Sequence, residues 1–288
     1  MRIEQTKVVI PAAGLGTRLL PATKEQPKEM LPVFASDNHG ILCVTPLVQL
    51  VFEQLFDCGL REFYFIVGKG KRAIEDHFTP DDDYLCRLSN SGKYTQALLL
   101  ERFYRKIGAS TVAWVSQSEP KGFGDAVLKA EFLVGTAPFI VQAGDTCLAS
   151  LNILERLAKE HAKGLADVSM VLKEVSDPRH YGVAEISQGE EEALSVKRVV
   201  EKPEQPTSRL AIMPLYVFNP TIFEALRTTP PGKGGEIQLT DAIQKLLDTG
   251  HRVQAVKLLP HDICFDVGTP ETYWMALEVS HRYALSRK

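Results

Sequence analysis

The sequence has few cysteines, and none of them forms a recognisable metal-binding or disulfide pattern. The five cysteines are scattered, odd in number and without a C-x-x-C pair. Such usage argues against a zinc ribbon or a disulfide framework and is typical of reduced thiols that fill core space. We therefore expect a cytoplasmic protein.

The sequence also lacks a long hydrophobic run and an excess of positive charge. The first apolar run begins at Lys7 and is too short for a signal peptide or a membrane span. The net charge of −3 argues against nucleic acid as the main partner, although a local basic cluster could hold a small anion. We expect neither a nucleic acid nor a membrane as partner.

The composition is that of an ordinary globular protein. The chain has 288 residues, of which 44% are apolar and 24% charged, enough for one large core. No internal repeat, low-complexity tract or flexible linker interrupts it. We predict a single domain over residues 1–288.

In the first half, apolar runs alternate with helical patterns. The runs predict strands at 7–12, 62–68, 110–116 and 138–144. Helices are predicted from Thr45, as N-cap with Pro46 in the first turn, and at 72–77 and 125–134. Residues 79–95 are polar and predict an exposed loop before a helix. This order favours a parallel sheet with crossover helices.

The pattern changes after residue 151. Four strand-like segments follow with few helices between them, and helices return at 220–226, 239–247 and 270–284. This half favours mixed or antiparallel sheet packed against the first. The fold class expected is α/β, a Rossmann-like three-layer α/β/α fold with a mixed, mainly parallel central sheet.

The loop "AAGLGTRL" follows the first predicted strand. A dinucleotide fingerprint requires a third glycine where this chain has Leu19, and no Walker pattern fits. A plain strand-to-helix turn explains the glycines but not Arg18, Lys24 and Lys28 in succession. Glycines allow backbone N–H groups to approach phosphate oxygens, and arginine adds permanently charged donors. The loop therefore predicts a phosphate site.

The pattern G-x-G-T-R-x-x-P-x-T, followed by P-K-E-M-L-P, resembles the signature of the sugar-1-phosphate nucleotidyltransferases. The form "GTRLLPATKEQPKEMLPV" resembles the bacterial UTP–glucose-1-phosphate uridylyltransferases in particular. The resemblance continues through "KRAIEDHF", "SEPKGFGDAV", "YGV", "VEKP", "GGEIQLTDAI" and "FDVGTPETY". It implies a nucleotide-binding half over residues 1–150, a sugar-phosphate-binding half with the C-terminal helix over 151–288, and a homodimer or homotetramer.

The reaction implied is attack by a phosphate oxygen of glucose 1-phosphate on the α-phosphorus of UTP, which releases pyrophosphate. Catalysis then consists of holding two anions in line and neutralising charge. The resemblance assigns catalytic roles to three residues: Arg18, Lys28 and Asp145. It implies Mg²⁺ as cofactor, held by Asp145 and Asp266, each of which follows an apolar run. A turn-forming aspartate is the alternative for both.

The resemblance also implies the binding residues. Those for the nucleotide are Ala12, Ala13, Gly14, Gly16, Thr17, Gln117 and Gly122. Gln117 can offer a donor and an acceptor to a pyrimidine imide, although a surface glutamine is the alternative. Asp125 stands where relatives often have histidine and receives no role.

The sugar phosphate is expected to contact Gly182, Glu201 and Lys202. Neighbouring residues of a strand point to opposite faces, so the chain must twist at Lys202 for both side chains to reach one ligand. The segment 234–241 is expected to support this site from behind, without a direct role for Glu236.

Two departures from the family leave the substrates open. Thr146 follows Asp145 where uridylyltransferases commonly carry a second aspartate, and Pro214 and Leu215 replace a Gly-Arg pair expected on the sugar side. A thymidylyltransferase using dTTP, a uridylyltransferase for another sugar 1-phosphate, and an inactive regulator that binds nucleotide sugars remain as alternatives.

Overall fold

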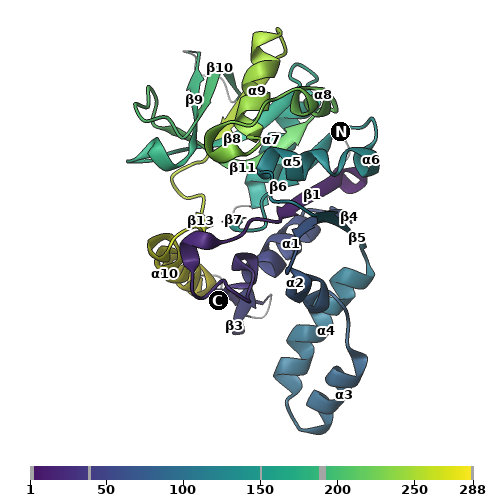
Figure 1. The fold of residues 1–288 in the computed structure, drawn as a ribbon. Coiled ribbons are helices and arrows are strands. Elements are labelled where there is room, and N and C mark those ends of the chain that lie inside the picture. Colours follow the sequence, from purple (N-terminus) through teal and green to yellow (C-terminus); the bar gives the residue numbers. More distant parts are fainter. Residues whose placement is uncertain (1–2, 38–39, 150, 188–192, 287–288) are drawn as a thin grey trace.

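The computed structural model describes residues 3–37, 40–149, 151–187 and 193–286 (Figure 1). Its centre is a nine-stranded sheet in the order β5-β4-β1-β6-β11-β8-β12-β10-β9. These strands are β1 (Lys7–Ala12), β4 (Glu62–Gly68), β5 (Thr111–Gln117), β6 (Phe139–Gln142), β8 (Val168–Glu174), β9 (Gly182–Ile186), β10 (Leu194–Glu201), β11 (Leu210–Phe218) and β12 (Val253–Lys257). Two small antiparallel sheets of two strands each pair β2 (Pro32–Ser36) with β3 (Leu42–Pro46), and β7 (Thr146–Leu148) with β13 (Cys264–Asp266).

The two halves of the sheet differ in strand direction. Strands β5, β4, β1 and β6 are all parallel. Beyond β6 the pairs are antiparallel, except for β8 with β12. The mixed sheet is confirmed, but parallel pairing, expected to be the main kind, dominates only the first half.

Helices cover both faces of the sheet. They are α1 (Leu47–Asp57), α2 (Arg72–His77), α3 (Asp82–Asn90), α4 (Tyr94–Gly108), α5 (Phe123–Leu128), α6 (Glu131–Val134), α7 (Leu151–Ala162), α8 (Thr221–Arg227), α9 (Leu239–Asp248) and α10 (Pro270–Ser286). Successive residues of β1 point into different cores, because side chains alternate along a strand. Val8 and Ile10 pack with α1, α4 and α7, whereas Val9 packs with α5, α8 and α9. The three-layer α/β/α arrangement is thereby confirmed.

Three local predictions were wrong. Thr45 and Pro46 do not start a helix; they belong to β3, where Thr45 pairs with Val33, and α1 begins at Leu47. The expected loop at 79–95 contains α3, because the Asp81 side chain accepts a hydrogen bond from Tyr84 N at 2.8 Å and caps that helix. The single helix expected at 125–134 is two short helices, α5 and α6.

The overall arrangement brings the two halves of the chain together. Strand β6 of the first half pairs directly with β11 of the second. Helices α3 and α4 project away from the sheet (Figure 1). Within the described ranges, no helix has the length and apolar character that a membrane crossing requires.

Candidate active site

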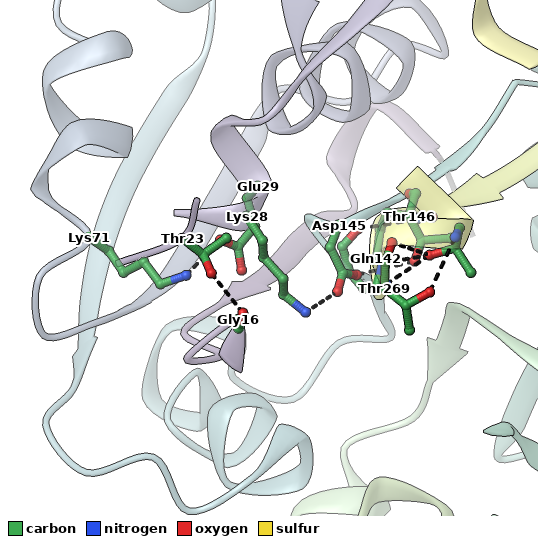
Figure 2. Close-up of polar contacts among 12 residues, drawn as sticks. Gly16, Thr23, Lys28, Glu29, Lys71, Gln142, Asp145, Thr146 and Thr269 are labelled. Carbon is green, nitrogen blue, oxygen red and sulfur yellow. Dashed lines mark hydrogen bonds and ion pairs between the residues drawn. The ribbon is translucent and has the colours of Figure 1, made fainter. Parts of the chain in front are cut away.

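Lys28 and Asp145 meet at the carboxyl end of the parallel strands. Lys28 begins a 3-10 turn (Lys28–Met30), and Asp145 lies between β6 and β7. The Lys28 Nζ donates to Asp145 Oδ2 (Figure 2). Although burial acts in the opposite direction, the Asp145 carboxylate raises the pKa of Lys28, and the ammonium lowers the pKa of Asp145. Both groups therefore stay charged near neutral pH.

The glycine loop places its backbone beside this ion pair. A Cβ at Gly14 would lie 3.5 Å from Lys28 Cε, so the lysine side chain passes directly over the loop. Gly16 has φ 65°, a left-handed conformation that favours glycine, and its carbonyl accepts a 2.8 Å bond from Thr23 Oγ1. The Lys28 side chain therefore lies beside Gly14, which is itself exposed.

The other basic residues of the loop face outward. Arg18 is exposed on a 3-10 turn (Thr17–Leu19) and is close enough to Lys28 to affect its pKa. Lys24 is 77% exposed and lies 3.6 Å from Glu25. Arg18 is thus placed to reach an anion over the loop, whereas Lys24 remains a solvated side chain.

A buried ion pair that the sequence analysis did not foresee holds the loop. Glu29 is 1% and Lys71 7% exposed, and Lys71 Nζ donates to Glu29 Oε2 at 2.7 Å. In Figure 2, Lys28 and Glu29 turn to opposite partners, the first to Asp145 and the second to Lys71. In the short motif "PKEM", Lys28 therefore contributes its positive charge to the candidate site, and Glu29 contributes its carboxylate to the interior.

Asp266 joins Asp145 through the small sheet of β7 and β13. Asp266 pairs in register with Thr146, and Val267 N donates to Asp145 O at 3.0 Å. Burial and the nearby Asp145 charge raise the pKa of Asp266. Two close carboxylates are a suitable donor set for a hard cation, because Mg²⁺ is commonly held by one or two carboxylates together with water and phosphate oxygens. The described residues contain no group of three or more His, Cys, Asp or Glu side chains that could hold a metal unaided.

Gln117 lies at the end of β5, close to the glycine loop. Its register partner is Gly68, and a Cβ at Gly68 would lie 2.8 Å from Ala13 O. The Gln117 Nε2 donates to Gly122 O at 3.1 Å and to Asp125 Oδ2 at 2.7 Å. The expectation that Gln117 offers both a donor and an acceptor to a ligand is therefore wrong, because its donors are already used.

Gly122 connects this region to the second half of the chain. It has φ 102°, and a Cβ there would lie 2.7 Å from Glu236 Cβ, so only glycine fits. The backbone carbonyl of its neighbour Lys121 accepts a hydrogen bond from Ile237 N at 2.8 Å. Glu236 and Ile237, which belong to the segment expected to support the sugar-phosphate site, therefore pack against Gly122.

Glu201 and Lys202 lie together despite their adjacent positions in sequence. Strand β10 ends at Glu201, and Lys202 has φ 41°, an unusual conformation for a residue other than glycine. This turn brings Lys202 Nζ to 2.7 Å from Glu201 Oε1, while Thr240 Oγ1 donates to Oε2 at 2.7 Å. Gly182 leaves room for the carboxylate, because a Cβ there would lie 3.2 Å from Oε2. The twist predicted at Lys202 is confirmed.

The two family departures have structural roles. Thr146 Oγ1 donates to Asp145 Oδ1 at 3.1 Å, and Pro214 coincides with a register shift in β11. Leu215 is buried in the core cluster that also contains Val8, so it does not line the sugar side as expected. Each departure puts an uncharged side chain where a charged one is expected, while Lys28, Asp145, Glu201 and Lys202 keep their charges at the candidate site.

A separate hollow of about 1000 Å³ lies between the β2–β3 hairpin, α1, α3 and α4, and its lining includes none of the candidate residues. Some of its charged side chains are paired with one another, as in Arg102 with Asp37 and Lys106 with Glu53. The chemistry of the side chains therefore places the candidate site at the loop after β1, away from this hollow.

Comparisons with known proteins give one consistent result. The family model described as nucleotidyl transferase matches residues 7–282. The chain is 41% identical over 244 residues to the UTP–glucose-1-phosphate uridylyltransferase of Bacillus subtilis, with 83% of this chain and 80% of that protein covered. It resembles the solved structure of an apo UDP-glucose pyrophosphorylase, with TM-score 0.83, 31% identity and coverage of 98% and 99%. It also resembles the UTP-bound UGPase of Acinetobacter baumannii, with TM-score 0.81, 30% identity and coverage of 98% and 94%.

Proposed function

The chain belongs to the nucleotidyl transferase family, and we propose that it transfers the uridylyl group of UTP to glucose 1-phosphate. A phosphate oxygen of the sugar phosphate forms a bond to the α-phosphorus, the bond from that phosphorus to the bridging β-oxygen breaks, and pyrophosphate leaves. The observation that carries the proposal is the Lys28–Asp145 pair lying over the Gly14 loop.

The nucleotide is assigned to the loop after β1. Backbone groups of Ala12, Ala13 and Gly14 lie beside Gln117 and Gly122 and are assigned to the base. The N–H groups around Gly16 and Thr17, with the exposed Arg18 guanidinium, are assigned to the triphosphate.

Lys28 is assigned to the charge that develops on the α-phosphate. Its ammonium pairs with Asp145 in this structure and stands beside the same loop, so a short movement transfers it to a phosphate oxygen. Placing a permanent positive charge there stabilises the transition state more than the ground state. No nucleophilic side chain is required.

Mg²⁺ is part of the proposal, held by Asp145 and Asp266 with phosphate oxygens completing its coordination. When bound, it would polarise the phosphate and offset negative charge. Lys28 and the cation would compete for the Asp145 carboxylate, so Lys28 is expected to leave Oδ2 in the loaded enzyme.

The sugar phosphate is assigned to the second half of the chain. The Glu201 carboxylate can accept hydrogen bonds from two sugar hydroxyls, and the Lys202 ammonium can pair with the phosphate. Gly182 and Thr240 hold Glu201 in position. Leu215 lies in the core and has no part in this assignment.

The test is to incubate the protein with Mg²⁺, glucose 1-phosphate and each of UTP, dTTP, CTP and ATP, and to measure pyrophosphate release. We expect release with UTP, and its loss when EDTA removes the metal. No pyrophosphate release with any pair would refute the enzymatic proposal. A preference for dTTP would instead identify the activity as that of a thymidylyltransferase. The same assay with galactose 1-phosphate and mannose 1-phosphate tests the sugar.

Assembly and location complete the proposal. We propose a homodimer or homotetramer in the cytoplasm. The five free cysteines are consistent with a reducing compartment. Light scattering on a size-exclusion column tests the assembly, and a monomer would contradict it.

A further inference from the structure

Gln117 presents one unused polar atom in an otherwise satisfied, buried amide. The side chain is 3% exposed at the end of β5. Its two hydrogen bonds, to Gly122 O and Asp125 Oδ2, both come from Nε2. Its Oε1 makes no hydrogen bond to any residue in the described ranges. Since Oε1 is not among the fully buried unpartnered atoms of the described residues, it reaches the surface beside the glycine loop and is free to accept a hydrogen bond from a ligand.

The chemistry of Asp125 and Gly122 decides which way the amide points. A backbone carbonyl and an ionised carboxylate can only accept hydrogen bonds, so both must face the amide nitrogen. Rotating the amide by half a turn would set its oxygen against two acceptors. The oxygen is therefore held on the opposite side, away from Asp125.

Asp125 is itself held firmly. It is 5% exposed in the first turn of α5, and its second oxygen lies 3.6 Å from Lys129 Nζ. The adjacent Gly124 N donates to Ile237 O at 2.9 Å and anchors this helix to the second half of the chain. The carboxylate thus has a fixed position from which to orient Gln117.

We infer that Asp125 is a positioning residue, which orients the Gln117 amide so that the site accepts a pyrimidine carrying a hydrogen on N3. This rests on the proposed function, which places the base beside Gln117. Uracil and thymine offer an N3–H donor to Oε1. Cytosine presents a lone pair at N3, which an amide oxygen repels. Asp125 therefore selects the imide bases against cytosine and does not separate UTP from dTTP.

The test compares wild type with Asp125→Asn, and Glu119→Gln, the same kind of change at an exposed carboxylate of the preceding loop, is the matched control. Calorimetric titration gives the dissociation constants of UTP and CTP without needing turnover, and pyrophosphate release gives kcat and KM. We expect wild type to bind UTP at least about tenfold more tightly than CTP. Asp125→Asn should reduce this ratio by about threefold, because asparagine can donate to the oxygen of a reversed Gln117 amide while Gly122 O still opposes the reversal. The change should appear in KM more than in kcat, with the melting temperature nearly unchanged. Glu119→Gln should keep the wild-type ratio.

Two results would overturn the inference. The first is that Asp125→Asn keeps the wild-type ratio of the dissociation constants for CTP and UTP. The second is that the variant loses affinity for both nucleotides equally, which indicates a merely structural role. If Asp125→Asn does not fold, wild type is titrated with 3-methyl-UTP, which lacks the N3 hydrogen; binding as tight as that of UTP refutes the inference. Selective UTP binding without pyrophosphate release would support the inference while refuting the proposed reaction.

Discussion

Lys28 and Asp145 are 117 positions apart in sequence and form one ion pair in the structure. The pair keeps a positive charge over the glycine loop, where the phosphates are proposed to bind. Each partner stabilises the charged form of the other. Despite burial, the pKa of Asp145 is lowered and that of Lys28 is raised. The pair is therefore part of the candidate site and not of the hydrophobic core.

We predict that Lys28→Ala and Asp145→Asn each reduce kcat by about a hundredfold or more, because each removes charge from the reacting phosphates or their metal. The free energy of unfolding should fall by only about 1 to 2 kcal/mol, since both side chains are partly open to solvent. Pyrophosphate release and urea denaturation measure the two quantities. Lys24→Ala is the control and should behave as wild type. Wild-type turnover in either variant would contradict the assigned roles.

The Glu29–Lys71 pair has the opposite character, because both partners are buried. Burial raises the pKa of Glu29 in spite of the nearby lysine charges. Removing one partner leaves the other charge unpaired in the interior, which typically costs about 3 to 5 kcal/mol.

We therefore predict that Glu29→Gln and Lys71→Met each destabilise the protein by about that amount, and that the double variant loses less than the sum of the two. A double-mutant cycle by urea denaturation measures the coupling. Glu25→Gln, at an exposed neighbouring position, is the control. A loss below about 1 kcal/mol in both single variants would show that the pair does not hold the loop.

At the scale of elements, the meeting of β9, β10 and α9 forms the proposed sugar site. Strand β10 ends in the turn at Lys202, and Thr240 in the first turn of α9 bonds Glu201. Gly182, at the start of β9, leaves the space between them, since a Cβ there would lie 2.9 Å from Thr240 Oγ1.

We predict that Gly182→Ala displaces Glu201 and raises the KM for glucose 1-phosphate by roughly tenfold, with the KM for UTP unchanged. Initial rates at varied sugar phosphate measure this. Gly108→Ala is the matched control, because a Cβ at Gly108 meets no atom within 4 Å. An unchanged KM for glucose 1-phosphate would contradict the assignment of Glu201 to the sugar site.

Helix α7 is tied to the sheet through a buried histidine. His161 Nδ1 lies 2.9 Å from Ser169 Oγ in β8, and its Nε2 lies 3.2 Å from Asn219 Oδ1. Since Asn219 Oδ1 accepts only, the neutral ring donates from Nε2 and accepts at Nδ1. Burial lowers the pKa of His161 below its ordinary value of 6.5.

A histidine whose pKa is lowered on folding stabilises the native state above its unfolded pKa and loses that contribution as the pH falls below it. We predict that lowering the pH from 7.5 to 5.5 reduces the free energy of unfolding by about 1 kcal/mol through His161. Urea denaturation at both pH values should show this difference lost in His161→Gln and kept in His261→Gln, an exposed control. The pKa of His77 is also lowered, and this contribution stays in both variants. Equal pH dependence in wild type and His161→Gln would contradict the prediction.

At the scale of the whole molecule, one sheet passes through both predicted halves. Pairing of β6 with β11, and of Lys121 O with Ile237 N, joins the nucleotide half to the sugar half by backbone hydrogen bonds. Neither half can unfold without opening this sheet or exposing the apolar side chains of the two shared cores.

We therefore predict a single cooperative unfolding transition for the whole chain. Scanning calorimetry on the protomer should give equal calorimetric and van't Hoff enthalpies. Nucleotide should raise the midpoint of this one transition, because a ligand bound only by the native state stabilises it. Two resolved transitions would show that the halves at residues 1–150 and 151–288 are separate domains.

The sequence by itself determined the class of fold and the phosphate loop, because these depend on local patterns. Apolar runs predicted the strands of the sheet, and the succession Gly14, Gly16, Arg18 and Lys28 predicted an anion site without any knowledge of distant contacts. The start of α1 was missed because the hairpin partner Val33, not local preference, keeps Thr45 in a strand.

Only the tertiary structure decided which charges meet. Glu29 lies next to Lys28 in sequence, yet one pairs with Lys71 in the interior and the other with Asp145 in the site. The Gln117 amide can both donate and accept, but Gly122 O and Asp125 occupy its donors in the folded chain. Neighbours in space use some of the donors and acceptors of a side chain, and only the others are free to bind a ligand. Which atoms are left free is therefore decided by tertiary packing.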